Sequence, residues 1–168
     1  MSTVRTFIAF AMPLACAIAG SAESAEKSAP NIVGTWRIVD FTQVVVETNE
    51  ITRPMGEKLL GFIQYSPGGH MITVISRADL PKPATLPYTD AERSAIHKGI
   101  VAYAGSYTVE GNKVTHHVLA GWRTDWIGGD QVRFAEVNGN RLLIKAPPVV
   151  NNVTGKTAES TLIFERAD

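Results

Sequence analysis

Residues 103–121 read YAGSYTVEGNKVTHHVLAG, and this stretch carries the clearest fold signal in the chain. On both sides of Gly111-Asn112, β-branched and aromatic residues alternate with small or polar ones. Such alternation is typical of strands, whose successive side chains point to opposite faces of a sheet. A two-residue connection of this kind is typical of a β-hairpin turn. The stretch therefore predicts two antiparallel strands, at 103–110 and 113–121.

Six further runs share this composition and are separated by prolines, glycines or asparagines. Asn138-Gly139 predicts a second hairpin turn between two of them. Eight antiparallel strands joined by tight turns favour a closed barrel or a sandwich, and closure removes the unpaired strand edges. The six further strands are expected at 33–46, 59–66, 70–76, 131–137, 140–146 and 160–166.

One short helix is predicted near residues 90–100. Thr89 and Glu92 have the spacing of a capping box, in which each side chain accepts a hydrogen bond from the backbone N–H of the other residue. Small and apolar residues then recur on one helical face, which we expect to lie against the sheet or to cover the open end of the barrel. That face carries Ala91, Ala95, Ile96, Gly99 and Ile100.

The composition is that of one folded domain. The chain has 168 residues, of which 45% are apolar and 19% are charged, and this content is too apolar for a disordered chain. The 16 basic and 16 acidic residues give no net charge. Because a nucleic-acid-binding protein needs a basic face to neutralise phosphates, this balance argues against such a function.

The first 22 residues are typical of a secretory signal peptide. Arg5 supplies the positively charged N-terminal region of such a peptide, and the apolar stretch 7–19 is too short for a stable membrane span. Cleavage would leave a small, polar tether at 23–30 and a domain at 31–168. We therefore expect export to the periplasm or the medium, with no stable membrane span in the mature protein.

Cys16 is the only cysteine in the chain and lies within the predicted signal peptide. A lipoprotein anchor at Cys16 is the less favoured alternative, because Pro13 stands where a leucine-like residue is expected. The mature domain then has no cysteine for a disulfide or for thiol chemistry.

The two ends of the domain carry a family resemblance. Gly34-Thr35-Trp36 opens the first expected strand, and Phe164-Glu165-Arg166 closes the last. A Gly-x-Trp motif in the first strand together with an arginine at the end of the last strand resembles the pattern of the calycin and lipocalin barrels. In those barrels the tryptophan closes the barrel floor and the arginine packs over its ring. The resemblance gives Gly34, Trp36 and Arg166 structural roles.

More specifically, the chain resembles the lipocalin-like domain family of bacteria and fungi. The resemblance covers about residues 32–166 and implies an eight-stranded antiparallel barrel of calycin type, whose interior can hold a small ligand. It implies the fold more than any particular activity. The matching stretches are 34–39, 61–71, 103–107, 114–118 and 126–133.

His116-His117 is the most conspicuous pair of polar residues in the predicted sheet. Neighbouring strand residues point to opposite faces, so the two histidines cannot ligate one metal ion from a regular strand. No other metal-ligand spacing occurs in the sequence, so no metal site is expected. We take His117 as the histidine that reaches a ligand inside the barrel; the alternative is a hydrogen-bonded histidine of the barrel wall.

Gln131 and Arg133 share one face of a predicted strand. If that face points inward, the buried charge of Arg133 needs a partner, which Asp130, Glu47 or a ligand carboxylate could supply. The alternative places Arg133 on the outer wall. Aromatic residues with a polar tip suit a cavity wall or a packed core. The candidate ligand-binding residues are Tyr65, Tyr103, Tyr107, His117, Trp126, Gln131 and Arg133.

Three functions remain open. The favoured one is a binding protein whose hydrophobic cavity takes a small lipophilic or aromatic ligand with an acid or carbonyl group. The second is a cofactor-free isomerase or cyclase, with His117, Tyr103 or Tyr107 as acid or base and Arg133 polarising a carbonyl. The third is a packed barrel that acts through its surface.

No catalytic residue and no cofactor are assigned, because the motifs of hydrolases and phosphate-binding loops are absent. A cavity of roughly 300 Å³ or more would favour the first two.

Overall fold

The computed structural model describes residues 29–151 and 154–168 of the chain. The predicted signal peptide, at 1–22, and most of the predicted tether, at 23–30, lie outside these residues. The elements are β1 (Gly34–Val45), β2 (Ile51–Thr52), β3 (Leu59–Tyr65), β4 (His70–Arg77), α1 (Asp90–Lys98), β5 (Ile100–Glu110), β6 (Lys113–Gly121), η1 (Thr124–Trp126), β7 (Asp130–Asn138), β8 (Arg141–Val150) and β9 (Thr157–Arg166).

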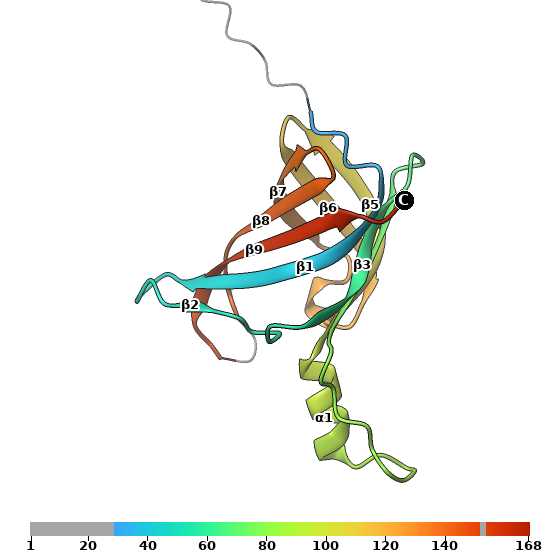
Figure 1. Cartoon of the computed structure of the whole chain (residues 1–168), viewed down its shortest axis with the longest axis vertical. Coiled ribbons are helices and arrows are strands. Elements are labelled where there is room, and N and C mark those ends of the chain that lie inside the picture. The colour runs from blue at the N-terminus through green and yellow to red at the C-terminus, as the bar shows by residue number, and fades with distance from the viewer. Residues whose placement is uncertain (1–28, 152–153) are drawn as a thin grey trace, which may run out of the picture.

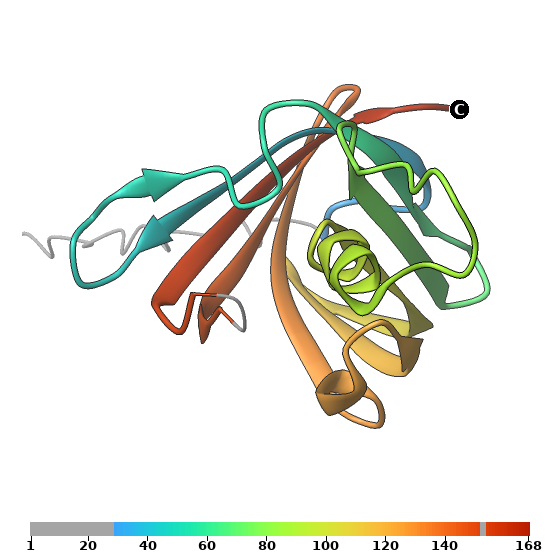
Figure 2. The ribbon, with the colours of Figure 1, turned by 90° about the horizontal axis from the view of Figure 1, so that it is seen from below.

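The strands form one antiparallel sheet that closes on itself. Its order is β2-β1-β3-β4-β5-β6-β7-β8-β9, and β1 also pairs with β9 from Trp36↔Arg166 to Val45↔Ala158. Eight strands therefore make a ring, and β2 is a short addition to the far end of β1 (Figures 1 and 2). This arrangement confirms the predicted eight-stranded antiparallel barrel and excludes the sandwich.

A β-bulge in β1 changes which residues of that strand face inward. The register against β9 shifts between Ile38 and Asp40, and one extra residue in a strand reverses its alternation. Trp36 and Ile38 are buried before the shift, whereas Gln43 and Val45 are buried after it. The bulge thus lets β1 contribute to the closed end and to the opposite half of the barrel.

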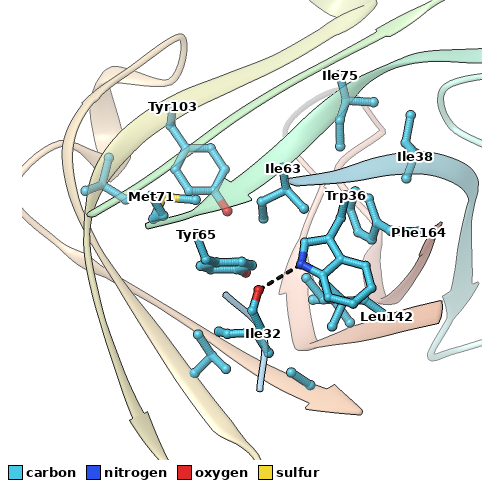
Figure 3. Close-up of a cluster of buried hydrophobic side chains, with 14 of the residues drawn as sticks. Ile32, Trp36, Ile38, Ile63, Tyr65, Met71, Ile75, Tyr103, Leu142 and Phe164 are labelled. Atoms are coloured by element: carbon cyan, nitrogen blue, oxygen red, sulfur yellow. Dashed lines mark hydrogen bonds between the residues drawn. The ribbon is translucent and has the colours of Figure 1, made fainter. Parts of the chain in front are cut away.

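The closed end is sealed by Trp36, which is fully buried. Its indole Nε1 donates to the carbonyl of Ile32 over 2.8 Å (Figure 3), and the guanidinium of Arg166 lies 4.0 Å from the centroid of its ring. Gly34 has a φ of +132°, and a side chain there would collide with Arg166. The predicted pairing of Trp36 with Arg166 is confirmed, and Gly34 leaves room for the arginine.

Helix α1 forms where the capping box predicts it. Thr89 accepts from the backbone N–H of Glu92, and the Glu92 carboxylate accepts from the backbone N–H of Thr89. No residue of the helix is buried, however, and α1 projects beyond one end of the barrel (Figure 1). Ala91 and Ala95 are exposed, so the first of the two expected placements, packing on the sheet, is wrong. The helix lies beside the open end of the barrel, where His97 Nε2 is 3.1 Å from the carbonyl oxygen of Trp122.

Candidate ligand-binding site

The barrel contains a cavity of about 380 Å³ in the half that opens beside α1. This volume lies within the range of about 300–1,000 Å³ that small-molecule sites occupy. Most of the wall is apolar. Its apolar residues include Phe41, Met55, Ile63, Ile75, Val101, Ile144, Leu162 and Phe164.

At one side of the cavity, three strands bring together two tyrosines and a histidine. His116 of β6 is 1% exposed. Its Nε2 lies 2.8 Å from the hydroxyl of Tyr65 on β3, and its Nδ1 lies 2.8 Å from the hydroxyl of Tyr103 on β5. Both ring nitrogens are thus hydrogen-bonded, and Tyr103 and His116 line the cavity while Tyr65 stands behind them.

These three groups are neutral near neutral pH. Burial lowers the pKa of His116 to about 3, and the charge of Arg133 adds to this effect, followed by His117. Burial also raises the pKa of both the Tyr65 and the Tyr103 hydroxyls, while Arg133 partly opposes the shift at each. Such groups recognise a ligand through hydrogen bonds and not through charge.

Arg133 supplies the positive charge of the site. In the register of β6 with β7, Gln131 pairs with His116 and Arg133 pairs with Val114, so Gln131 and Arg133 face the interior with them. The Arg133 guanidinium lies 5.7 Å from the centroid of the Trp126 ring and donates to the carbonyl of Val132 over 2.7 Å. The alternative position on the outer wall is excluded, since Arg133 lines the cavity.

Arg133 has no acidic partner in the part of the chain that the structure describes, where no aspartate or glutamate forms an ion pair with it. Asp130, one partner that the sequence suggested, instead pairs with His117. Glu47, the other, lies in the turn after β1 and does not line the cavity. Of the three expected partners, a ligand carboxylate is the one that remains.

Aromatic rings form the wall next to Arg133. Trp126 makes edge contacts with Tyr103 and Trp122, with ring centroids 5.5 Å and 5.0 Å apart. The guanidinium of Arg123 lies 4.9 Å from the centroid of the Trp126 ring. Trp126 belongs to η1, which follows the end of β6 at the open end, so Trp126 lies at the mouth of the barrel.

A second polar cluster lies on the opposite wall. Gln43 of β1 donates from Nε2 to the hydroxyl of Ser160 over 3.0 Å, and its Oε1 accepts from Asn151 over 3.0 Å. β1 stands four places from β6 in either direction round the ring. Gln43 and Ser160 are not among the predicted residues. Alternation counted from Trp36 would place Gln43 on the outer face, and the bulge in β1 turns it inward.

The structure reverses the assignment of the two neighbouring histidines. His117 lies on the outer face of β6, where its Nδ1 is 2.7 Å from Asp130 and its Nε2 is 3.3 Å from the hydroxyl of Thr108. The prediction that His117 faces the interior is therefore wrong, and His116 takes that position. One signal was present: His116 alternates with Val114 and Val118, the apolar side of the strand, whereas Lys113 and Thr115 share the side of His117.

The other predicted residues fall into two groups. Tyr103, Trp126, Gln131 and Arg133 line the cavity together. Tyr107 does not line it: its hydroxyl donates to the carbonyl of Ser66 over 2.9 Å, and its ring packs edge-on against Tyr65 at 5.0 Å. Tyr65 reaches the cavity only through its hydrogen bond to His116.

No group of three or more His, Cys, Asp or Glu residues that could hold a metal ion occurs within 29–151 and 154–168. The described portion of the chain also contains no helix long and apolar enough to cross a membrane.

A family model for the lipocalin-like domain matches residues 33–167. The chain belongs to this family. The match runs from the start of β1 past the end of β9, so the cavity and the Trp36–Arg166 closure both lie inside the lipocalin-like domain. No curated protein and no solved structure matches the chain. The family therefore establishes a lipocalin-like barrel, a fold suited to binding small molecules.

Proposed function

We propose that this lipocalin-like barrel binds a small lipophilic or aromatic molecule that carries a carboxylate or carbonyl group. The observation that carries the proposal is the place of Arg133, which lines an apolar cavity without an acidic partner among the described residues. A charge in such surroundings is stabilised by an opposite charge or by strong hydrogen-bond acceptors. A ligand carboxylate offers both.

The chemistry of the wall suits such a ligand. An arginine guanidinium binds a carboxylate with two parallel hydrogen bonds, and Tyr103 and Gln131 stand beside Arg133 as further polar groups. The hydrophobic part of the ligand would displace water from the isoleucines and phenylalanines of the remaining wall, which is favourable. At about 380 Å³ the cavity favours a small ligand.

The site of action forms part of the proposal. The predicted signal peptide at 1–22 supports a role in the periplasm or outside the cell, where the barrel would carry or sequester its ligand.

A cofactor-free isomerase or cyclase is the second candidate. The observation that favours it is that Arg133 and Tyr103 lie next to each other on the cavity wall. Two hydrogen-bond donors aimed at one carbonyl oxygen stabilise the negative charge that develops there in proton transfers and ring closures. Turnover of a carbonyl ligand by the purified protein, lost in Arg133→Met, would favour this candidate over simple binding.

The binding proposal is tested by displacement of a dansylated fatty acid, with decanoate and decanol as competitors. Replacing Arg133 with methionine keeps the apolar stem and removes the charge. We expect Arg133→Met to weaken decanoate binding by tenfold or more, because a charged hydrogen bond contributes about 1.5–3 kcal/mol. Decanol binding should change little.

Arg123→Met is the matched control. Arg123 also contacts the Trp126 ring and lines the cavity, but its charge is paired with Asp125. We expect this variant to keep the preference for decanoate over decanol. Equal preference in wild-type protein and Arg133→Met would contradict the proposed anchor.

A further inference from the structure

The hydrogen bonds of His116 fix the direction in which the Tyr103 hydroxyl points its proton. A neutral imidazole has one N–H donor and one bare nitrogen acceptor. Since each nitrogen of His116 contacts one tyrosine hydroxyl, one tyrosine must donate to the ring and the other must accept from it. The two arrangements leave different groups facing the cavity.

Tyr65 decides between them. Its side chain is among the most deeply buried in the barrel, at 1% exposed, and the only hydrogen-bond partner of its hydroxyl within the described residues is His116. If Tyr65 accepted from the imidazole, its own O–H would be buried without an acceptor, at a cost of about 1–3 kcal/mol. Donation from Tyr65 to Nε2 avoids this cost.

The second nitrogen of His116 then carries the proton. Nδ1–H donates to the Tyr103 oxygen, and Arg133 is near enough for its positive charge to lower the pKa of the same phenol, against the larger effect of burial. Because its oxygen accepts from the histidine, Tyr103 has its own hydrogen left for a group in the cavity that it lines.

We propose that Tyr65, acting through His116, holds Tyr103 as a hydrogen-bond donor to the ligand, so that Tyr103 and Arg133 form a two-donor site for one carboxylate or carbonyl. This inference rests on the proposed function and narrows the ligand class. An oxygen with free lone pairs satisfies both donors, whereas an ammonium group satisfies neither. Tyr65 is a positioning residue, since it does not touch the cavity.

The first experiment measures the tautomer of His116 by nitrogen NMR of the ligand-free protein. The expected result is a neutral ring with its proton on Nδ1, the nitrogen that faces Tyr103. A proton on Nε2 would overturn the inference, because Tyr103 would then donate to the histidine and have no proton to offer the ligand. Because no ligand is present, this result is independent of the proposed function.

The second experiment compares Tyr65→Phe with Tyr107→Phe in the decanoate and decanol competition. Tyr107 is the matched control, since it packs against Tyr65 and its hydroxyl donates to the carbonyl of Ser66, away from His116. Without the Tyr65 hydroxyl, Tyr103 is free to donate to the histidine. We expect Tyr65→Phe to lower the preference for decanoate over decanol at least fivefold and to move the His116 proton away from Nδ1. Tyr107→Phe should change neither.

The outcomes separate the two proposals. An unchanged preference in Tyr65→Phe would overturn the inference while leaving the arginine anchor intact. Failure of the wild-type protein to bind decanoate would overturn the proposed ligand class and the two-donor site with it, even if the NMR result assigns the proton to Nδ1.

Discussion

At the closed end of the barrel, Arg166 stacks on Trp36, donates to the carbonyl of Val33 and pairs with Asp168. In the hollow half, Arg133 contacts Trp126 but has no acidic partner among the residues described. Both arginines lie over a tryptophan, yet one has its charge neutralised by the chain and the other does not. A neutralised charge contributes to the stability of the fold, whereas an unpaired charge in a cavity is available to a ligand. The comparison predicts that changes at the closed end alter stability and leave ligand preference unchanged.

The largest effect is expected at Trp36. Replacing a fully buried tryptophan with alanine removes its packing and leaves a cavity, and such changes cost about 3–5 kcal/mol. Urea unfolding should show Trp36→Ala destabilised by this amount. Trp122→Ala is the control, since Trp122 lies at the mouth and is only partly buried. An equal loss in the two variants would contradict the division of the barrel into a structural end and a binding half.

The next effect concerns pH. The pKa of His116 is lowered from 6.5 to about 3 in the folded protein, so between these values the unfolded chain binds more protons than the folded one. Stability is therefore expected to fall as the pH is lowered from 6.5 towards 3, by up to about 1.4 kcal/mol per pH unit from this residue. Unfolding free energies of the wild type and His116→Gln, measured across this range, should diverge, with the variant less dependent on pH.

His117→Gln is the control for this measurement. Its side chain is 39% exposed and lies on the outer face of the same strand. Because burial is the largest cause of the His116 shift and His117→Gln leaves His116 buried, the pH profile of His117→Gln should stay closer to the wild type than that of His116→Gln. If the pH profiles of His116→Gln and His117→Gln ran parallel to each other, burial of His116 would not govern the acid sensitivity.

A smaller effect is expected at Arg166. A guanidinium over an indole contributes about 0.5–2 kcal/mol, so Arg166→Ala should lower the thermal midpoint. The relative affinities for decanoate and decanol should be those of the wild type, because the residue lies outside the cavity. An unchanged midpoint would refute the stabilising role of the pair, and a changed ligand preference would refute the comparison between the two ends.

The smallest effect is expected at Asp168. The pKa of its carboxyl is lowered from 3.8, first by the backbone N–H of Thr35 and then by Arg166. A carboxyl whose pKa is lowered by folding stabilises the fold at pH values above its unfolded pKa. That contribution is lost as the pH falls through the pKa of the folded state. Asp168→Asn should therefore melt slightly below the wild type at neutral pH, and the difference should vanish in strong acid. A difference that persists there would exclude the carboxylate as its cause.

The sequence predicted the features that depend on local patterns. The hairpin turn at Gly111-Asn112 and the capping box at Thr89 are set by residues close together in the chain, and both were found where expected. The second hairpin turn lies one residue later than predicted, at Gly139-Asn140, because Asn138 still pairs with Arg141. The pairing of Trp36 with Arg166 was also predicted, from the family resemblance.

The features that failed depend on register and packing. The choice between His116 and His117 requires knowing which face of β6 points inward, and alternation alone defines two faces without saying which is inside. Gln43 was missed because the bulge between Ile38 and Asp40 shifts the alternation of β1.

The seam between β1 and β9 joins the two most distant parts of the domain. Val33 and Arg166, which meet across it, are 133 residues apart. Contacts of this range form late, because the entropy of closing a long loop must be offset before they contribute. The ring of strands is therefore complete only when β9 has docked against β1, so a chain that ends before β9 would have no enclosed ligand site.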